Sequence, residues 1–433
     1  MKGNKLKIGL LGFGTVGQGV FRGIRENRKL IKQRAGLELE VKKICVRNKK
    51  KKRSLKVSEK MLTTKAEEII NDREIDVVVE LMGGIEPAKT HITNALRKGK
   101  FVVTANKALL ARHGTELFRE AERNKADIYF EASVCGGIPI ILALSLGLSA
   151  NRIKSMHGIL NGTCNYILTK MSKEGKGFGE ALKEAQEKGF AEANPAFDVE
   201  GLDARQKLAI LASLAFNAEI GERQIFAEGI TGITDKDIEY AKEMGYCIKL
   251  LGIAKNDGKK LELRVCPAMI PLEHPLAAVS NEFNAVLLDG DLMGEQLFYG
   301  KGAGSGPTAS AVIADLINVG QDIANKSSGK IHLMDLAHKR KKGVKAIGET
   351  ESKYYLRMKV KNQAGVLAKI AKALGENNAS IETVVQKEPT KKNAVIVLML
   401  YNAREKNIRK ALEEIAKTSV LKGKPRLIRV EDI

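Results

Sequence analysis

Cysteine is scarce in this sequence, and its pattern excludes a disulfide-stabilised protein. The five residues are odd in number and scattered over a chain of 433 residues: Cys45, Cys135, Cys164, Cys247 and Cys266. Such thiols are typical of a reduced, cytoplasmic protein. The six histidines form neither an HExxH motif nor a Cys/His cluster, so we do not expect a transition-metal site.

A membrane-spanning apolar run is also missing. Residues 132–151 carry no charge and approach the length of a transmembrane helix. The stretch nevertheless contains Gly136, Gly137, Pro139 and Gly147 together with several serines, and it therefore predicts a loop leading into a buried helix. The N-terminus enters a strand pattern at once, with no signal-peptide pattern before it. We expect no membrane partner.

Acidic residues are outnumbered, with 51 Asp and Glu against 73 Lys and Arg, which gives a net charge of +22. Such a surplus is typical of nucleic-acid binding. The cations are spread among acids, however, and no aromatic-rich basic module accompanies them. Proteins that handle phosphorylated or acidic metabolites are also basic. We expect no nucleic-acid partner, and a metabolite-sensing nucleic-acid binder is kept as an alternative.

A glycine motif lies close to the N-terminus. The stretch IGLLGFGTVGQGV, residues 8–20, follows a strand pattern at 7–11 and leads into apolar residues at helical spacing. A strand, a tight glycine turn and a helix N-terminus together bind the pyrophosphate of a dinucleotide. The predicted cofactor-binding residues are Gly12, Phe13, Gly14, Thr15, Val16 and Gly17. The alternative is a strand-to-helix turn that binds no ligand.

The end of the second predicted strand, residues 38–46, indicates which dinucleotide is bound. An NAD-binding domain usually carries a carboxylate there, on the ribose 2′-hydroxyl. This chain instead has Arg47, followed by a basic run to residue 53. An arginine suits a 2′-phosphate, so the sequence favours NADP(H) over NAD(H). A solvated basic loop is the alternative.

Strand and helix patterns alternate through the first part of the chain. Strands are predicted at 7–11, 38–46, 76–80, 101–104 and 127–131. This alternation predicts an α/β fold with a doubly wound parallel sheet, a Rossmann-type dinucleotide-binding domain over residues 1–138. The loops at 81–84 and 105–107 then lie at the carboxyl edge of the sheet, where ligands bind.

Residues 139–341 carry a mixed pattern that predicts an α+β catalytic domain. Helices are predicted at 179–188, 201–214 and 308–323, and strands at 153–159, 249–255, 261–266 and 283–289. The glycine-rich YGKGAGSGPTAS, residues 299–310, precedes the last of these helices. We expect that helix to pack back on the first domain.

The C-terminal part begins after a charged stretch. Residues 342–351 are poor in apolar side chains and predict a linker. Residues 352–433 then carry two helix patterns and four strand patterns in the order βαββαβ, which is the ferredoxin-like arrangement. We expect this tail to fold apart from the catalytic half, so that truncation after Thr350 leaves catalysis intact.

Several motifs together resemble homoserine dehydrogenases. They are LGFGTVG, TANKALL, GILNGTCNYIL, GFAEANPAFDVEGLDARQKLAIL and GKGAGSGPTASAV, and the resemblance covers residues 5–340. The tail sequence VKNQAGVLAKIAKAL resembles an ACT domain, with Asn362 where an Asp is usual. The resemblance implies NAD(P)-dependent interconversion of L-homoserine and L-aspartate 4-semialdehyde in threonine and methionine biosynthesis. It also implies a homodimer or higher homo-oligomer that pairs through residues 139–341, and an amino-acid effector such as threonine.

The residue types and their spacing can be compared with the needs of this reaction independently of the resemblance. Reducing an aldehyde leaves an alkoxide that needs a proton from a positioned acid. Asp203 and Lys207 are four residues apart and share a face if a helix begins near Gly201. By spacing alone they could equally be a surface ion pair. The resemblance implies that Lys207 is the catalytic proton donor and acceptor and that Asp203 binds the substrate beside it.

The same resemblance assigns further residues. Glu192 and Asp198 match positions that bind the amino acid, and Lys107 matches a lysine near cofactor and substrate. Without the resemblance, Lys107 could be a helix-start lysine in solvent. Further cofactor positions are implied at Gly83, Gly189 and Gly302.

One metal site is implied by resemblance alone. In relatives, the loop that corresponds to residues 131–138 holds a sodium ion through main-chain carbonyls. The matching residues are Glu131, Val134, Gly136 and Ile138. Oxygen-only coordination suits a hard cation. A different Rossmann oxidoreductase acting on an amino or hydroxy acid is the second enzyme that the sequence allows.

Overall fold

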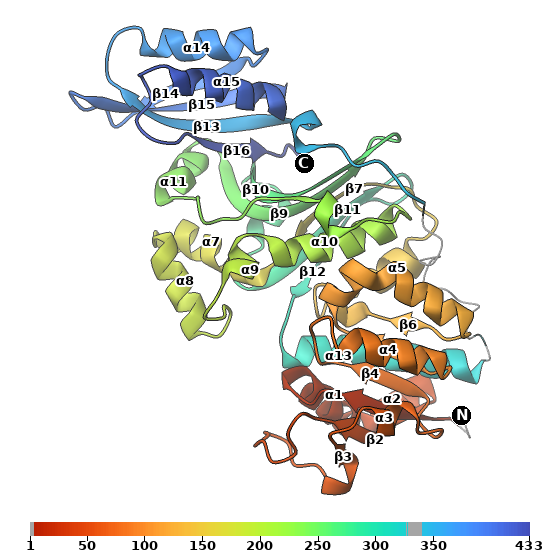
Figure 1. The fold of residues 1–433 in the computed structure, drawn as a ribbon. Coiled ribbons are helices and arrows are strands. Elements are labelled where there is room, and N and C mark those ends of the chain that lie inside the picture. The colour runs from red at the N-terminus through yellow and green to blue at the C-terminus, as the bar shows by residue number, and fades with distance from the viewer. Residues whose placement is uncertain (1–3, 326, 328–339) are drawn as a thin grey trace. The chain divides into compact units, whose positions relative to one another are not determined.

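The computed structural model describes residues 4–325, 327 and 340–433. The chain divides into two compact units, and Figure 1 shows the helices and strands of the chain. The first comprises Met1–Met156, Gln206–Arg223 and Asn284–Lys342, and the second comprises His157–Arg205, Gln224–Phe283 and Gly343–Ile433. Each unit is described by itself below.

The first unit is built on a six-stranded parallel sheet in the order β3-β2-β1-β4-β5-β6. Its strands are β1 (Lys5–Leu11), β2 (Glu38–Cys45), β3 (Leu62–Thr63), β4 (Val77–Glu80), β5 (Phe101–Thr104) and β6 (Ile128–Tyr129). The predicted doubly wound sheet is therefore confirmed. The strand expected at 127–131 is shorter, because the chain turns into a 3-10 segment at Glu131–Ser133.

Helices cover both faces of this sheet. Its helices are α1 (Thr15–Glu26), α2 (Arg28–Ala35), α3 (Glu67–Ile70), α4 (Ala88–Arg97), α5 (Lys107–Arg123), the short α6 (Ile140–Leu142) and α13 (Ser305–Ala324). Apolar residues of α1, α2 and α13 pack on one face, and those of α3, α4 and α5 pack on the other. Although α13 comes late in the chain, it lies beside α1 (Figure 1), and a side chain at Gly19 would meet the backbone of Ser305 at 2.7 Å.

Three further strands begin or lie in the first unit, namely β7 (Ile153–Ile159), β11 (Phe283–Gly290) and β12 (Gly294–Lys301). A π-helical turn, Ala143–Gly147, follows α6. The sequence did not predict β12, because most of its residues are exposed and so it lacks an apolar alternation.

The second unit contains one continuous sheet with the strand order β9-β10-β16-β13-β15-β14, and β8 also pairs with β10. The bounds are β8 (Phe226–Ala227), β9 (Tyr246–Asn256), β10 (Leu261–Pro271), β13 (Glu351–Lys361), β14 (Ile381–Lys387), β15 (Asn393–Arg404) and β16 (Arg426–Val430). The helices are α7 (Gly162–Glu174), α8 (Phe178–Glu187), α9 (Ala196–Val199), α11 (Asp235–Glu243), α12 (Pro275–Ala278), α14 (Val366–Glu376) and α15 (Glu405–Lys417). Helix α10 (Leu202–Ala215) starts in this unit.

The tail has the predicted βαββαβ order, β13-α14-β14-β15-α15-β16, and α14 and α15 cover one face of its sheet (Figure 1). It is nevertheless joined to the strands before it. Strand β16 pairs in parallel with β10, with Ala268 opposite Arg429 and Met269 opposite Val430. The expectation that the tail folds apart is therefore wrong in one respect, because its last strand lies between β13 and β10.

The stretch expected to be a linker, 342–351, also contacts this sheet. The backbone of Leu261, at the start of β10, bonds to the carbonyl of Gly343 and the N–H of Lys345, each at 2.8 Å. A 3-10 turn at Ile347–Glu349 leads into β13. Over residues 4–325, 327 and 340–433 the model contains no helix whose length and apolar content would let it cross a bilayer.

Candidate active site

The turn between β1 and α1 carries three glycines, and packing requires two of them. Gly12 has φ +107°, and a Cβ there would lie 2.7 Å from the carbonyl oxygen of Leu81. At Gly17 a Cβ would lie 2.5 Å from the carbonyl oxygen of Gly12. At Gly14, the N-cap of α1, it would meet no atom of the described residues within 4 Å. Packing therefore explains the first and third glycines, whereas the second suits close approach of a phosphate to the helix N-terminus.

The other residues of this turn anchor it. Phe13 is buried and meets Phe21 edge-on, with ring centroids 5.8 Å apart. Val16 packs against the core under α1. The carbonyl of Thr15 accepts a hydrogen bond of 3.0 Å from the Ser305 hydroxyl, at the start of α13. The first turn of α1 is therefore held before any ligand binds.

The basic loop after β2 is ordered by its own side chains. The Arg53 guanidinium donates to the carbonyls of Asn48, Lys49 and Lys51 at 2.7–3.1 Å. The side-chain oxygen of Gln18, on α1, accepts bonds from the Ser54 hydroxyl at 2.9 Å and the Leu55 N–H at 3.2 Å. Arg53 therefore stabilises the conformation of this loop.

Arg47 lies two residues after the end of β2 and is exposed. The residue after it, Asn48, accepts a bond of 2.8 Å from the N–H of Lys50, which turns the chain there. The strand end that usually carries a ribose-binding acid carries this cation instead. Its chemistry fits a 2′-phosphate.

A buried carboxylate organises the carboxyl edge of the sheet. Glu80, at the end of β4, accepts bonds from the N–H groups of Met82 at 2.7 Å and Gly83 at 3.0 Å. Its other oxygen accepts from the Thr104 hydroxyl at 2.7 Å, at the end of β5. The loop with the predicted cofactor residue Gly83, which has φ +71°, is thus fixed to the next strand.

Lys107 is the first residue of α5, and the residue before it positions this helix. Asn106 caps α5 by accepting a bond of 3.1 Å from the Leu109 N–H. Its amide also donates to the Gly84 carbonyl at 2.7 Å. Sequence reasoning did not identify Glu80 or Asn106, although an Asn before a helix pattern is a recognised N-cap signal.

The loop 131–138 fits a cation through its backbone only. The Glu131 side chain is buried and accepts bonds from the N–H groups of Ile141 at 2.9 Å and Leu142 at 2.7 Å, so it caps α6. Burial raises the pKa of Glu131 to about 7. Burial, and Glu131 nearby, also raise the pKa of Asp315, which accepts a 2.9 Å bond from the Glu131 N–H. Main-chain oxygens are the donors that remain for a hard ion here.

The rest of this loop is strongly bent. Cys135 and Gly136 have φ 53° and 45°, and a Cβ on Gly136 would lie 2.6 Å from the carbonyl oxygen of Gly302. The Ile138 carbonyl accepts a bond of 2.8 Å from the Ile140 N–H and retains a second lone pair. The predicted cofactor residue Gly302 has no room for a side chain either, because Asn284 packs against it. Within the part of the chain that the structure describes, no group of three His, Cys, Asp or Glu side chains suits a metal.

In the second unit, two predicted substrate acids share one partner. The Asn161 amide donates to Asp198 and to Asp203, each at 2.8 Å. Asn161 itself follows β7 and is the N-cap of α7. The structure therefore brings Asp198 and Asp203 together through a residue that the sequence analysis did not single out, despite its N-cap position.

The loop that carries Glu192 is attached to the same helix. The Thr163 hydroxyl donates to the Phe190 carbonyl at 2.6 Å, and the Tyr166 and Phe190 rings pack with centroids 4.9 Å apart. Glu192 itself is exposed, and its carbonyl accepts a bond of 3.0 Å from the Gln186 side chain.

Gly189, predicted to bind cofactor, follows Lys188, the C-cap of α8, and lies in the second unit. It has φ +74°, and its N–H donates to the Gln186 carbonyl at 3.0 Å. A left-handed glycine at this position is a common way to end a helix. Helix termination therefore accounts for this glycine without a ligand.

Helix α10 forms as the sequence predicted and carries Asp203 and Lys207 four residues apart. The spacing puts both on one face of the helix, one turn apart. Asp203 is buried, and Lys207 is half-buried. A carboxylate and an ammonium are thus presented by one rigid element.

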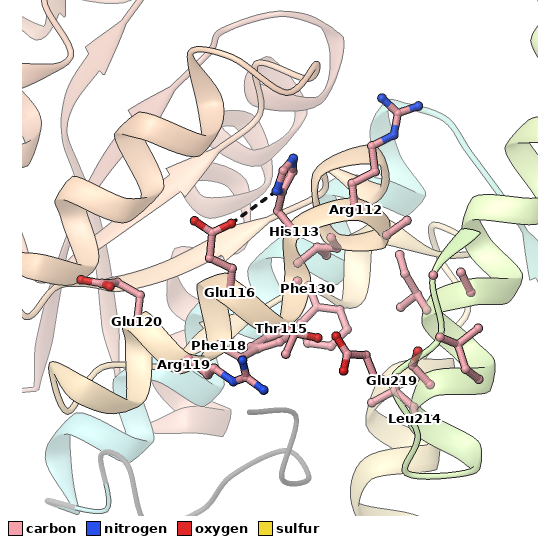
Figure 2. Close-up of a pocket in the computed structure, with 18 of the residues that line it drawn as sticks. Arg112, His113, Thr115, Glu116, Phe118, Arg119, Glu120, Phe130, Leu214 and Glu219 are labelled. Carbon is pink, nitrogen blue, oxygen red and sulfur yellow. Dashed lines mark ion pairs between the residues drawn. The ribbon is translucent and has the colours of Figure 1, made fainter. Parts of the chain in front are cut away.

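A cavity of about 560 Å³ in the first unit lies beside α5 and is shown in Figure 2. Its apolar lining includes Phe118, Phe130 and Leu214, and its rim carries the His113–Glu116 ion pair at 3.4 Å. None of the residues predicted for chemistry is among those that line it. We therefore do not assign the reaction to this cavity.

A parallel Rossmann sheet with this glycine turn, together with the acid pair and α10, defines an NAD(P)-dependent oxidoreductase. The models of two homoserine dehydrogenase domains match the chain, the NAD-binding domain over residues 12–131 and the homoserine dehydrogenase domain over 139–317, and the ACT domain model matches 354–419. The chain belongs to the homoserine dehydrogenase family, which serves amino-acid biosynthesis, and it carries a C-terminal ACT domain.

Known proteins resemble the chain over most of its length. It is 43% identical to the homoserine dehydrogenase of Bacillus subtilis over 429 residues, 98% of each chain. The crystal structure of a homoserine dehydrogenase from Thiobacillus denitrificans is 42% identical and has a TM-score of 0.93, covering 99% of this chain and 98% of that one. A hyperthermophilic archaeal homoserine dehydrogenase in complex with NADPH is 27% identical, with a TM-score of 0.61, and covers 73% of this chain and 98% of that one.

Proposed function

We propose that the chain interconverts L-homoserine and L-aspartate 4-semialdehyde and prefers NADP(H) to NAD(H). The observation that carries this proposal is the acid pair Asp198 and Asp203, which Asn161 holds together; Asp203 lies one helical turn before Lys207 on α10. An amino-acid substrate needs anions for its ammonium and a proton donor for the alkoxide that forms on reduction.

NADP(H), when bound, supplies or accepts the hydride. The turn with Gly12, Gly14 and Gly17 holds its pyrophosphate at the N-terminus of α1. Lys107, at the start of α5, lies near the reacting groups. Arg47 contacts the 2′-phosphate, and the archaeal relative has been solved in complex with NADPH. The other proposed contacts are Phe13, Thr15, Val16, Gly83, Gly189 and Gly302.

The chain's own residues orient the substrate and move its proton. Asp198, Asp203 and Glu192 bind the substrate ammonium. Lys207 donates a proton to the C4 oxygen when the aldehyde is reduced and accepts it when the alcohol is oxidised. A lysine suits this role because its side-chain nitrogen can give up and take back a proton, and α10 holds it one turn from Asp203.

A sodium ion is proposed at the loop 131–138. The carbonyls of Glu131, Val134, Gly136 and Ile138 would hold it, and the ion would offset their partial charges and brace this bent loop. The Glu131 carboxylate is used by α6 and takes no part.

Threonine is proposed as an effector of the ACT domain, in a homodimer or higher homo-oligomer. Gly365 has φ +82° and is the N-cap of α14, where a backbone N–H suits a carboxylate. The Asn362 side chain nearby donates to the Thr390 carbonyl at 2.7 Å through its amide nitrogen. Its amide oxygen is an acceptor that suits the ammonium of an amino acid.

One assay tests the proposed activity. Aspartate semialdehyde is added to the enzyme with NADPH or with NADH, and oxidation of each cofactor is followed, with and without L-threonine. We expect faster turnover with NADPH and a change of rate with threonine. Oxidation only with other amino- or hydroxy-acid carbonyl compounds would instead identify a different oxidoreductase.

A further inference from the structure

The two substrate acids are held by a neutral side chain. Asn161 lies at the N-cap of α7 with φ −125° and ψ 111°, and only 4% of its surface is exposed. Its amide oxygen accepts a bond of 2.8 Å from the Cys164 N–H. Its amide nitrogen donates to one oxygen of Asp198 and one of Asp203, both at 2.8 Å. All polar atoms of this side chain therefore have partners.

Because the Asn161 amide is uncharged, it does not cancel the charge of the two carboxylates that it bridges. Two carboxylates bound to one amide nitrogen lie close enough to repel each other. A lysine or arginine bridge would relieve that repulsion by cancelling negative charge. The Asn161 amide orients both carboxylates by hydrogen bonds and adds no charge of its own to the pair.

The first turn of α7 is also attached to the segment that carries Asp198 and to the loop that carries Glu192. The Cys164 thiol lies 3.2 Å from the Asp198 carbonyl, and the Thr163 hydroxyl bonds to the Phe190 carbonyl in the loop before Glu192. Loss of the Asn161 amide would therefore move the two carboxylates while the Cys164 and Thr163 bonds still hold the Asp198 segment and the loop before Glu192.

We propose that Asn161 is a positioning residue that sets the spacing of Asp198 and Asp203 and thereby selects substrates with an ammonium group. The inference rests on the proposed function. Asn161 acts through the two acids and makes no contribution to hydride or proton transfer. Its effect is confined to recognition of the amino group.

The test separates bridging from helix capping. Asn161→Ser keeps a side-chain oxygen that caps α7 well but removes both donors. Asn27→Ser makes the same change at the N-cap of α2, where the side chain forms no capping bond, and is the matched control. Each enzyme is assayed with L-homoserine and with 4-hydroxybutanoate, which lacks the amino group.

We expect Asn161→Ser to raise the KM for homoserine about ten- to a hundred-fold, with little change in the KM for NADP or in the melting temperature. Weak turnover of 4-hydroxybutanoate should be unaffected, so the preference for homoserine should fall by the same factor. A native KM, or an equal loss on both substrates, would overturn the proposal. If the wild-type enzyme does not turn over homoserine, the proposed function fails instead.

A second variant, Asn161→Asp, keeps the proposal testable if the Asn161→Ser enzyme does not fold. Asn161→Asp keeps the shape and the capping oxygen and places a third carboxylate against the pair. Like charges disfavour ionisation, so the acidic limb of the kcat/KM profile should move to higher pH. A role in capping alone would leave that limb in place, and an unmoved profile would contradict the proposal.

Discussion

Lys207 lies half-buried on α10, one turn beyond Asp203. If it transfers the proton, Lys207→Ala should lower turnover by about two to four orders of magnitude, because proton transfer by a positioned group contributes that much. Binding of NADPH, measured by fluorescence titration, should be unchanged. Lys183→Ala, an exposed lysine on α8, is the control. Near-native turnover of the variant would remove Lys207 from the mechanism.

Arg47 and Arg53 lie in one basic loop but have different surroundings. Arg47→Ala should weaken NADPH binding much more than NADH binding, because only NADPH carries the 2′-phosphate. Arg53→Ala should weaken both cofactors to a similar extent, because Arg53 bonds to three carbonyls of the loop. Dissociation constants of both cofactors for both variants provide the comparison. Equal losses for Arg47→Ala would show that Arg47 only supports the loop.

At the scale of single residues, the sequence pointed to groups with ligand chemistry and missed those that hold them. Lys107, Asp198 and Asp203 stood out through charge and motif. Glu80 and Asn161 did not, because their partners are backbone groups and side chains that only the fold brings together. An N-cap pattern marks Asn161 as the start of a helix but does not show which acids its amide contacts.

At the scale of elements, the turn from β1 to α1 allows a paired test. Gly12→Ala should lower the melting temperature, because its Cβ would lie 2.7 Å from the Leu81 carbonyl in a left-handed conformation. Gly14→Ala should leave the melting temperature unchanged and weaken both NADPH and NADH. Thermal melts and cofactor titrations of both variants decide. A destabilised Gly14→Ala enzyme with native cofactor affinity would refute the assignment of Gly14 to phosphate binding.

Elements were predicted well where burial gives a periodic pattern. The strands β1, β2, β4 and β5 and the helices α10 and α13 lie within a few residues of their predicted bounds. Helix α7 was missed because buried residues lie almost all round it, so no polar face marks a 3.6-residue period. Strand β12 was missed for the opposite reason, since most of it is exposed.

At the scale of the second unit, buried ion pairs link β10 to the end of the chain. Arg264, wholly buried on β10, pairs with Glu262 and with Glu431, which follows β16. Burial alone would raise the pKa of Glu431, but Arg264, His157 and Lys255 together hold it well below its usual value. The ionised carboxylate therefore stabilises the folded state at neutral pH.

Glu431→Gln should destabilise the protein by about 3–5 kcal/mol at pH 7, because it leaves a buried arginine without one of its partners. The folded-state pKa of Glu431 is lowered, so its contribution is present above the unfolded-state pKa of about 4.3 and is lost as the pH falls below that value. The difference between variant and wild type should therefore narrow on acidification. Thermal melts from pH 7 to pH 3 measure it, with the exposed Glu413→Gln as control. A constant difference would contradict this account.

Because β16 pairs with β10, truncation after Thr350 should affect the stability of the protein as well as its regulation. Removing β16 would expose the edge of β10 at Ala268 and Met269 and would take Glu431 away from Arg264. We expect the truncated protein to melt at a lower temperature and to self-associate in size-exclusion chromatography. Asn362→Ala keeps the sheet and is the cleaner test of the effector site, because it removes the proposed ammonium acceptor from an exposed side chain and should weaken only the response to threonine. A truncated enzyme with native stability would show that β10 does not need β16.

The order of the domains followed from the sequence, but their junction did not. Hydrophobic periodicity shows that β10 and β16 are strands, and it carries no information on which strand is the neighbour of which. Arg264 and Glu431 lie 167 residues apart in sequence, and their pairing arises only when both strands are in place.

The position of β16 also has a consequence for how the protein is made. It is the last of the described strands, yet it lies inside the sheet, between β10 and β13. During synthesis β10 leaves the ribosome long before β16, so its edge stays unpaired until β16 has also emerged. The parallel sheet of the first unit has all six of its strands by residue 129 and does not wait in this way. Emergence of β16 is therefore the event that completes the sheet of the second unit, and conditions that stall translation between β10 and β16 should leave an aggregation-prone nascent chain.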